Sequence, residues 1–173
     1  MIRACWRRLA LASFAPVMVL SAMAGCGGDK PTQPEPGNCQ YSGITRTRED
    51  GFVISVDPDD WACPADTGSS GEPVTRLYAA YPNPARPMTA VRFSLGRVEH
   101  VTLAILGPPS CDTVRTLVHQ EQRAGTHQIV WDGRDAQGSL APPGVYRCVM
   151  TAGTFSCRGD IEIQQAEGRK EDN

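Results

Sequence analysis

Alternating side-chain polarity along residues 76–163 constrains the fold more than any other feature of the 173-residue chain. Three strands are expected there, each with three side chains on one face: Val91, Phe93 and Leu95; Val101, Leu103 and Ile105; His127, Ile129 and Trp131. Gly and Pro interrupt the alternation at short intervals, and low aromatic content (6%) with 17 Gly and 14 Pro favours a loop-rich β protein. Short alternating strands separated by turns indicate an all-β, antiparallel β-sandwich.

The end of this domain is expected to form a hairpin, with strands at residues 145–151 and 154–163 around Ala152-Gly153. With that turn, Cys148 lies opposite Cys157 at a non-hydrogen-bonded position, where side chains approach most closely. We therefore predict a Cys148–Cys157 disulfide. Because Ala-Gly is not a favoured two-residue turn, a three-residue loop with a slipped register stays open as the alternative.

Residues 39–66 are expected to form a small separate unit. Strand candidates at residues 44–48 and 52–56 flank Glu49-Asp50-Gly51, and an Asp-Gly pair is a strong hairpin signal. An isolated hairpin is only marginally stable, and closure by a Cys39–Cys63 disulfide would contribute about 3 kcal/mol. This pairing leaves Cys111 either as a buried free thiol or as an intermolecular link.

An acidic stretch follows this hairpin, with carboxylates at Asp57, Asp59 and Asp60. A calcium loop is a weak alternative, because the stretch lacks the alternating ligands and the turn glycine of such loops. Capping of a turn is the preferred interpretation, so no metal and no cofactor are expected.

The N-terminal 25 residues have the organisation of a secretion signal. Arg3, Arg7 and Arg8 precede an apolar run at residues 9–20, which is too short to span a bilayer because a span needs about 20 apolar residues. Small residues then lead to Cys26, and Leu-Ser-Ala-Met-Ala-Gly-Cys resembles a bacterial lipobox. The resemblance implies cleavage after residue 25 and diacylglycerol on Cys26; an ordinary secretory signal is the alternative.

The processed protein is then expected in the cell envelope, bound to the membrane through the lipid on Cys26. By analogy with lipoproteins of two-membrane bacteria, Gly27 favours the outer membrane. Residues 27–38 predict a Pro-rich tether that reaches about 35 Å, residues 67–75 a linker, and residues 164–173 a disordered tail. Removing the signal leaves 14 basic against 19 acidic residues, which argues against nucleic-acid binding.

Five motifs in the main domain resemble the FlgD-type immunoglobulin-like domain. They are YPNP at residues 81–84, VRTLV at 114–118, AGTH at 124–127, WDGRDAQG at 131–138 and PGVY at 143–146. The resemblance implies an Ig-like sandwich of about seven strands over residues 76–163. The YPNP opening and the Gly-x-Tyr ending are also similar to the C-terminal sorting domain of type IX secretion cargo.

Elementary chemistry assigns structural roles within these motifs. Asp132 and Asp135 are expected to accept backbone N–H bonds in a turn, and Asn83 between two prolines to make a rigid bend. Trp131 and Tyr146 are expected core anchors.

The predicted function is a non-catalytic, membrane-anchored module that binds or scaffolds an unknown envelope protein or glycan. Enzyme activity is not expected, because His100, His119 and His127 lie in or beside strands and the chain has neither a G-x-S-x-G nor an H-E-x-x-H motif. The alternative is a sorting domain that an export machine recognises. Fold resemblance alone cannot assign a role in flagellar assembly.

Overall fold

The computed structural model describes Cys39, residues 41–64 and residues 74–164. Every regular element among these residues is a β-strand. The strands are β1 (Arg46–Thr47), β2 (Val53–Ser55), β3 (Arg76–Leu77), β4 (Thr89–Leu95), β5 (Glu99–Gly107), β6 (Asp112–Gln122), β7 (Gly125–Trp131), β8 (Gly144–Ala152) and β9 (Phe155–Ile163).

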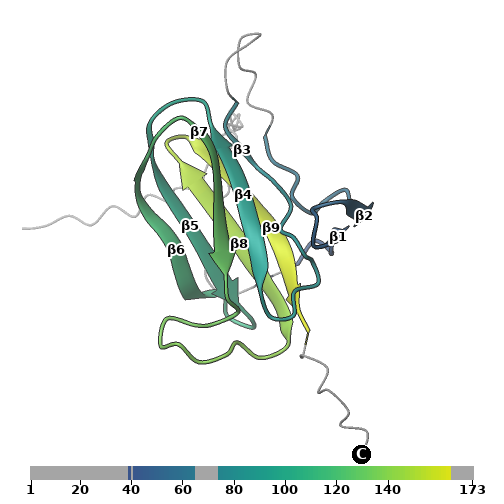
Figure 1. Cartoon of the computed structure of the whole chain (residues 1–173). Helices are drawn as coiled ribbons and strands as arrows, with labels where there is room; N and C mark the ends of the chain where they lie inside the picture. The colour runs from purple at the N-terminus through teal and green to yellow at the C-terminus, as the bar shows by residue number, and fades with distance from the viewer. Residues whose placement is uncertain (1–38, 40, 65–73, 165–173) are drawn as a thin grey trace, which may run out of the picture. The chain divides into compact units, whose positions relative to one another are not determined.

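Seven strands form two antiparallel sheets that face each other. One sheet has the order β3-β4-β7 and the other the order β6-β5-β8-β9, and Figure 1 shows the two layers. β1 and β2 form a separate two-stranded hairpin. The predicted sandwich of about seven strands preceded by a small hairpin is therefore confirmed.

The core lies between the two sheets and follows the predicted alternation. The six apolar side chains expected to face inward from β4 and β5 are fully buried: Val91, Phe93, Leu95, Val101, Leu103 and Ile105. On β7, Trp131 is also fully buried, while the alternate residue Val130 is half exposed on the outer face. Period-two alternation thus gave the correct inward face for all three strands.

The antiparallel connections place loops at two opposite ends of the sandwich. At one end, β5 joins β6 through the turn that contains Cys111, and β8 begins. At the other end, β4 joins β5 through residues 96–98, and β8 joins β9 at Gly153. We call these the Cys111 end and the Gly153 end.

The β8–β9 turn differs from the expected one. Ala152 pairs with Phe155, so the turn residues are Gly153 and Thr154. Gly153 has φ +57°, and a two-residue hairpin turn with a positive φ at its first central position favours Gly there. The predicted Ala152-Gly153 turn is wrong, and each β9 residue pairs two positions away from the expected partner.

The hairpin prediction for residues 44–56 is confirmed, since β1 and β2 pair antiparallel on either side of the predicted turn. Residues Pro34–Asn173 form one compact unit, which contains every described residue. Within the described part of the chain, no helix is long and apolar enough to cross a membrane.

Candidate functional site

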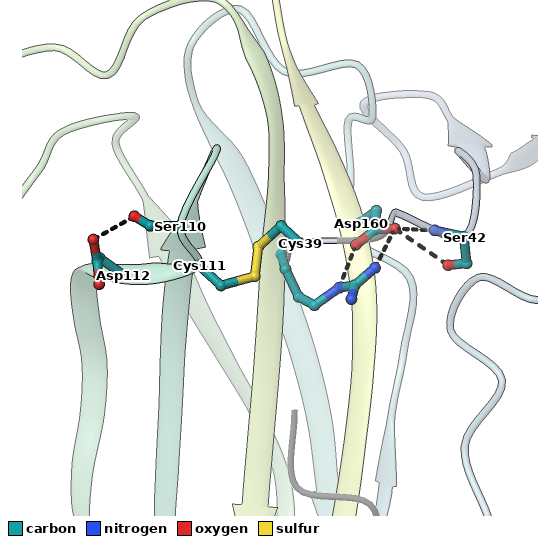
Figure 2. The surroundings of a disulfide bond; sticks show 7 residues. Cys39, Ser42, Ser110, Cys111, Asp112 and Asp160 are labelled. Carbon is teal, nitrogen blue, oxygen red and sulfur yellow. Dashed lines mark hydrogen bonds and ion pairs between the residues drawn. A yellow bond between two sulfur atoms is a disulfide. The ribbon is translucent and has the colours of Figure 1, made fainter. Parts of the chain in front are cut away.

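Both disulfides connect the segment before the sandwich to the sandwich itself. Cys39 is bonded to Cys111, with their Cα atoms 5.2 Å apart, and Cys63 is bonded to Cys157, with their Cα atoms 5.0 Å apart. We call Cys39 and residues 41–64 the clasp. Its two cystines attach it at the Cys111 end and at β9, and Figure 2 shows the first of them.

The predicted Cys148–Cys157 disulfide is wrong because of the β8–β9 register. Cys157 pairs with Met150, and Cys148 pairs with Gly159. Cys148 is instead a free, fully buried thiol, and desolvation, with a smaller contribution from Asp160, raises its pKa. A thiol that stays protonated and inaccessible is a packing group rather than a nucleophile.

The predicted Cys39–Cys63 disulfide and the unpaired Cys111 are wrong for a related reason. A Cys39–Cys63 bond would make the hairpin a unit that is stabilised by its own contacts, and such a unit would need an apolar face to bury. All three residues of β2 are exposed instead. The clasp is stabilised by the sandwich instead, so its two cysteines bond to residues that lie 72 and 94 positions along the chain.

A buried ion pair lies beneath the start of the clasp. The Arg147 guanidinium donates to both carboxylate oxygens of Asp160, from Nε to Oδ1 at 2.9 Å and from Nη2 to Oδ2 at 3.0 Å. The two side chains are 4% and 0% exposed, and they come from directly paired positions of β8 and β9. This two-pronged geometry offsets part of the cost of removing both charges from water.

The clasp completes the surroundings of this ion pair. The Ser42 backbone N–H donates to Asp160 Oδ2 at 2.7 Å, and the Ser42 hydroxyl donates to the same oxygen at 3.2 Å. Figure 2 shows Ser42 and Cys39 on either side of Asp160. The Tyr41 ring lies 5.5 Å from the Arg147 guanidinium carbon, and desolvation followed by the charge of Asp160 raises the pKa of Tyr41.

Asn83 joins the clasp to the outer edge of β9. Its side-chain NH2 group donates to the backbone carbonyls of Thr45 and Asp160, both at 2.9 Å. Its side-chain carbonyl oxygen, Oδ1, accepts the Glu162 N–H at 3.0 Å. Its own backbone N–H donates to Thr47 Oγ1 at 2.9 Å. Asn83 is fully buried. Its bonds occupy backbone groups of Asp160 and Glu162 on the edge strand β9 that would otherwise be open to pairing with another strand.

Asp60 contacts the same edge through its carboxylate. It accepts the Thr45 N–H and the Asp160 N–H, each at 2.7 Å. Burial nevertheless outweighs these donors and raises the pKa of Asp60 from 3.8 to about 6. Asp57 accepts the Asp59 N–H at 3.1 Å, a turn-capping bond. Among the described residues, no three His, Cys, Asp or Glu side chains form a group that could hold a metal ion.

Trp61 explains why β9 has a glycine at position 159. A Cβ added to Gly159 would lie 2.0 Å from the Trp61 ring, so the close packing of this indole needs glycine at that position. Trp61 also packs against the sandwich core, next to Cys63. The clasp therefore covers β9 by packing as well as by hydrogen bonds.

The motifs of the sandwich have the structural roles expected for them. Trp131 and Tyr146 are in edge-to-face contact in the core, with ring centroids 5.3 Å apart. Asp132 accepts the Arg134 N–H at 3.1 Å, and Asp135 accepts the N–H groups of Gln137 and Ser139 at 2.9 and 2.8 Å. Turn capping accounts for both carboxylates.

The motifs that contain Trp131, Asp132, Asp135 and Tyr146 lie in a part of the chain that matches a known family, whereas YPNP at residues 81–84 lies outside it. Residues 89–155 match the FlgD Ig-like domain. The match extends from the start of β4 to the first residue of β9, so the FlgD-matched segment excludes the clasp, β3 and nearly all of β9. No curated protein matches the chain.

The three histidines lie in or beside the FlgD-matched strands as expected, and their contacts are structural. His100 and His119 meet edge to face on exposed positions of β5 and β6, with ring centroids 4.8 Å apart. His127 stacks on Phe93 at 5.0 Å, and its Nε2 lies 2.8 Å from the Arg123 carbonyl oxygen. His119 Nδ1 also lies 3.1 Å from the Thr102 hydroxyl, between exposed side chains of two paired strands.

Sequence reasoning missed Asn83, Asp160 and Arg147 as the residues that attach the clasp. Asn83 looked like a bend because prolines flank it, and its three side-chain bonds connect residues up to 79 positions away. Arg147 and Asp160 alternate with the core residues of β8 and β9 and therefore lie on the other face of the sheet, where the sequence pattern predicts exposed charges. Cys26 and the lipobox expected before it lie outside the described residues.

Proposed function

We propose that this protein is a lipid-anchored, extracytoplasmic protein whose Ig-like domain binds or scaffolds a component of the cell envelope without catalysis. The observation that carries the proposal is the FlgD Ig-like match at residues 89–155, since such domains are non-catalytic sandwiches. The lipobox-like residues before Cys26 supply the anchoring part of the proposal.

The two cystines support the compartment. Disulfides persist in extracytoplasmic, oxidising surroundings and are rare in the cytosol. Here they pair four of the five cysteines among the described residues, and the fifth, Cys148, is buried in the core. The same chemistry favours a binding role over a thiol-dependent enzyme, because desolvation keeps the thiol of Cys148 protonated.

The edge of β9 bears on the sorting alternative. An export machine that recognises a final strand by pairing with it would need access to its free edge. In this protein, Asn83 and Asp60 hydrogen-bond that edge at Asp160 and Glu162, and Ala85 bridges to Ile163. This favours the binding or scaffolding role.

Anchoring is tested by the intact mass of the membrane-extracted protein and by fractionation of a Cys26→Ser variant. We expect an N-terminus at Cys26 with acyl chains, a single alkylatable thiol after denaturation without reductant, and loss of the variant from the membrane fraction. Cys5→Ser is the matched control, because Cys5 lies in the cleaved signal and its loss leaves the mature protein unchanged. An unacylated mature N-terminus contradicts the proposal.

The role of the sandwich is tested by deleting residues 76–173. A binding or scaffolding domain predicts that the remaining lipoprotein still reaches the membrane. Failure of the truncated protein to reach its normal location, with acylation intact, would instead support the sorting role.

A further inference from the structure

A stripe of apolar side chains is exposed on one face of the β1–β2 hairpin, where the Arg48 guanidinium carbon lies 4.7 Å from the centroid of the Phe52 ring. Phe52, Ile54 and Val56 are 61%, 61% and 70% exposed, and their spacing of two residues along an extended strand places them on the same face. We call these three residues the stripe. Contiguous exposed apolar patches mark sites of protein or membrane contact.

The stripe is held out from the sandwich by specific bonds. Thr47 donates its backbone N–H to the Asn83 carbonyl at 2.8 Å and its hydroxyl to the Ala80 carbonyl at 2.6 Å. The Arg48 backbone N–H donates to the Phe52 carbonyl at 2.9 Å, and this bond closes the hairpin. Figure 1 shows the hairpin projecting beside β9. The stripe is therefore a presented surface and not a collapsed loop.

We propose that the stripe docks on the lipid surface to which Cys26 is anchored. This rests on the proposed anchoring. Only twelve residues separate Cys26 from Cys39, and a chain of that length spans at most about 45 Å. Cys39 is bonded at the Cys111 end, and the hairpin begins only seven residues later, at Arg46. The stripe is thus kept within reach of the bilayer at all times.

The size of the stripe argues for lipid over a second copy of the chain. Three side chains supply a few hundred Å² at most, below the roughly 800 Å² per partner of a standard protein interface. A surface to which the chain is already tethered has an effective concentration on the order of millimolar, so a small patch suffices there. Apolar side chains of this kind enter the boundary between headgroups and acyl chains to a depth of about 5–10 Å.

Charges around the hairpin indicate that the attraction is apolar. Arg46 and Arg48 are balanced by Glu49 and Asp50, and Arg48 is ion-paired with Asp50 at 3.1 Å. Docking is therefore expected to be insensitive to salt, unlike the binding of a polybasic segment to anionic lipid.

Docking also orients the domain. The bond from Thr47 to Asn83 and the bond from Asn83 to Glu162, one residue before the end of β9, place the hairpin toward the Cys111 end. The Gly153 end then faces away from the lipid. Val98, 53% exposed in the β4–β5 connection at the Gly153 end, is a matched reference position.

The test uses the mature lipoprotein with its acyl chains, reconstituted in vesicles of phosphatidylcholine with a minority of phosphatidylglycerol. Phe52→Trp and Val98→Trp variants are compared in vesicles with and without brominated acyl chains, after subtracting the signal of the unsubstituted protein. We expect bromine to reduce the added F52W emission about twofold and to leave V98W unchanged, with no effect of about 0.5 M salt. Adding Ile54→Ser and Val56→Ser to F52W should restore the emission.

Flotation of the same samples separates the two proposals. Protein that does not float with the vesicles overturns the anchoring and the docking together. Floating protein whose F52W emission is unquenched, or quenched to the same extent as V98W, overturns the docking alone. A blue shift of F52W that grows with protein concentration but not with bromine identifies a second copy as the occupant and also overturns it.

Discussion

The FlgD-matched segment and the clasp are stabilised by different forces. The segment buries alternating apolar side chains between two sheets, with Phe93, Leu103 and Trp131 fully inaccessible. The clasp places few apolar side chains in that core. It is held by two cystines, by hydrogen bonds from Ser42 to the buried ion pair and by side-chain bonds to the edge of β9. A short segment without a core of its own can thus be fixed by covalent and polar contacts.

The largest effect is expected in the core. Trp131→Ala removes a fully buried indole and its edge-to-face contact with Tyr146, which should lower the free energy of unfolding by about 4 kcal/mol. Urea denaturation followed by circular dichroism measures this loss. The neighbouring Val130→Ala is the control, because Val130 faces outward and its loss should cost less than about 0.5 kcal/mol. Equal effects of the two variants would mean that the sheets do not enclose the core as described.

The ion pair should come second. Arg147→Met leaves the Asp160 carboxylate buried without its counter-charge, which should cost about 3 kcal/mol. Arg147→Lys keeps the charge but loses the two-pronged geometry, so it should be intermediate. Arg158→Met, at an exposed β9 position, should be neutral in the same denaturation experiment. A neutral Arg147→Met would show that the buried Asp160 carboxylate does not depend on the charge of Arg147.

The contrast also explains how much could be predicted from sequence. The inward faces of β4, β5 and β7 were predicted correctly because period-two alternation is visible within each strand. The capping roles of Asp132 and Asp135 were also predicted correctly, because each carboxylate bonds to N–H groups a few residues away. The clasp depends on pairings across long separations, and cysteine spacing does not determine connectivity.

The β8–β9 turn and Asn83 show why the contacts of the clasp could not be predicted from local sequence. The strands of the last hairpin were placed correctly, but moving the turn from Ala152-Gly153 to Gly153-Thr154 was enough to separate Cys148 from Cys157. Asn83 could be located in a rigid Pro-flanked stretch, yet nothing local shows that its amide meets Thr45 and Asp160.

Loss of one cystine should loosen the clasp and spare the core. Replacing both Cys39 and Cys111 by Ser should cost about 2 kcal/mol, because Cys63–Cys157 still attaches the other end of the clasp. Hydrogen exchange should show faster exchange at Ser42 and Thr45, with amides of β4 and β5 unchanged relative to the new global stability. A uniform increase across the sandwich would instead mean that clasp and core unfold as one unit.

Per pH unit, the smallest effect concerns the carboxylate that contacts the β9 edge. Because burial raises the pKa of Asp60 to about 6, from 3.8, the folded protein holds its proton more tightly than the unfolded chain. The stabilising contribution of this group is complete below pH 3.8 and is lost as the pH rises through about 6, at no more than about 1.4 kcal/mol per pH unit.

Asp60→Asn isolates this contribution, because the amide resembles the protonated acid and does not titrate. The unfolding free energy of the variant minus that of the original protein, from urea titrations between about pH 4 and pH 7, should rise with pH and then level off. Other carboxylates, including the nearby Asp160, are common to both proteins and cancel to first order. A difference that is constant across the range, or that falls with pH, would mean that the Thr45 and Asp160 N–H donors outweigh burial at this site. The clasp would then be fixed to β9 most firmly by a charged group and not by a neutral one.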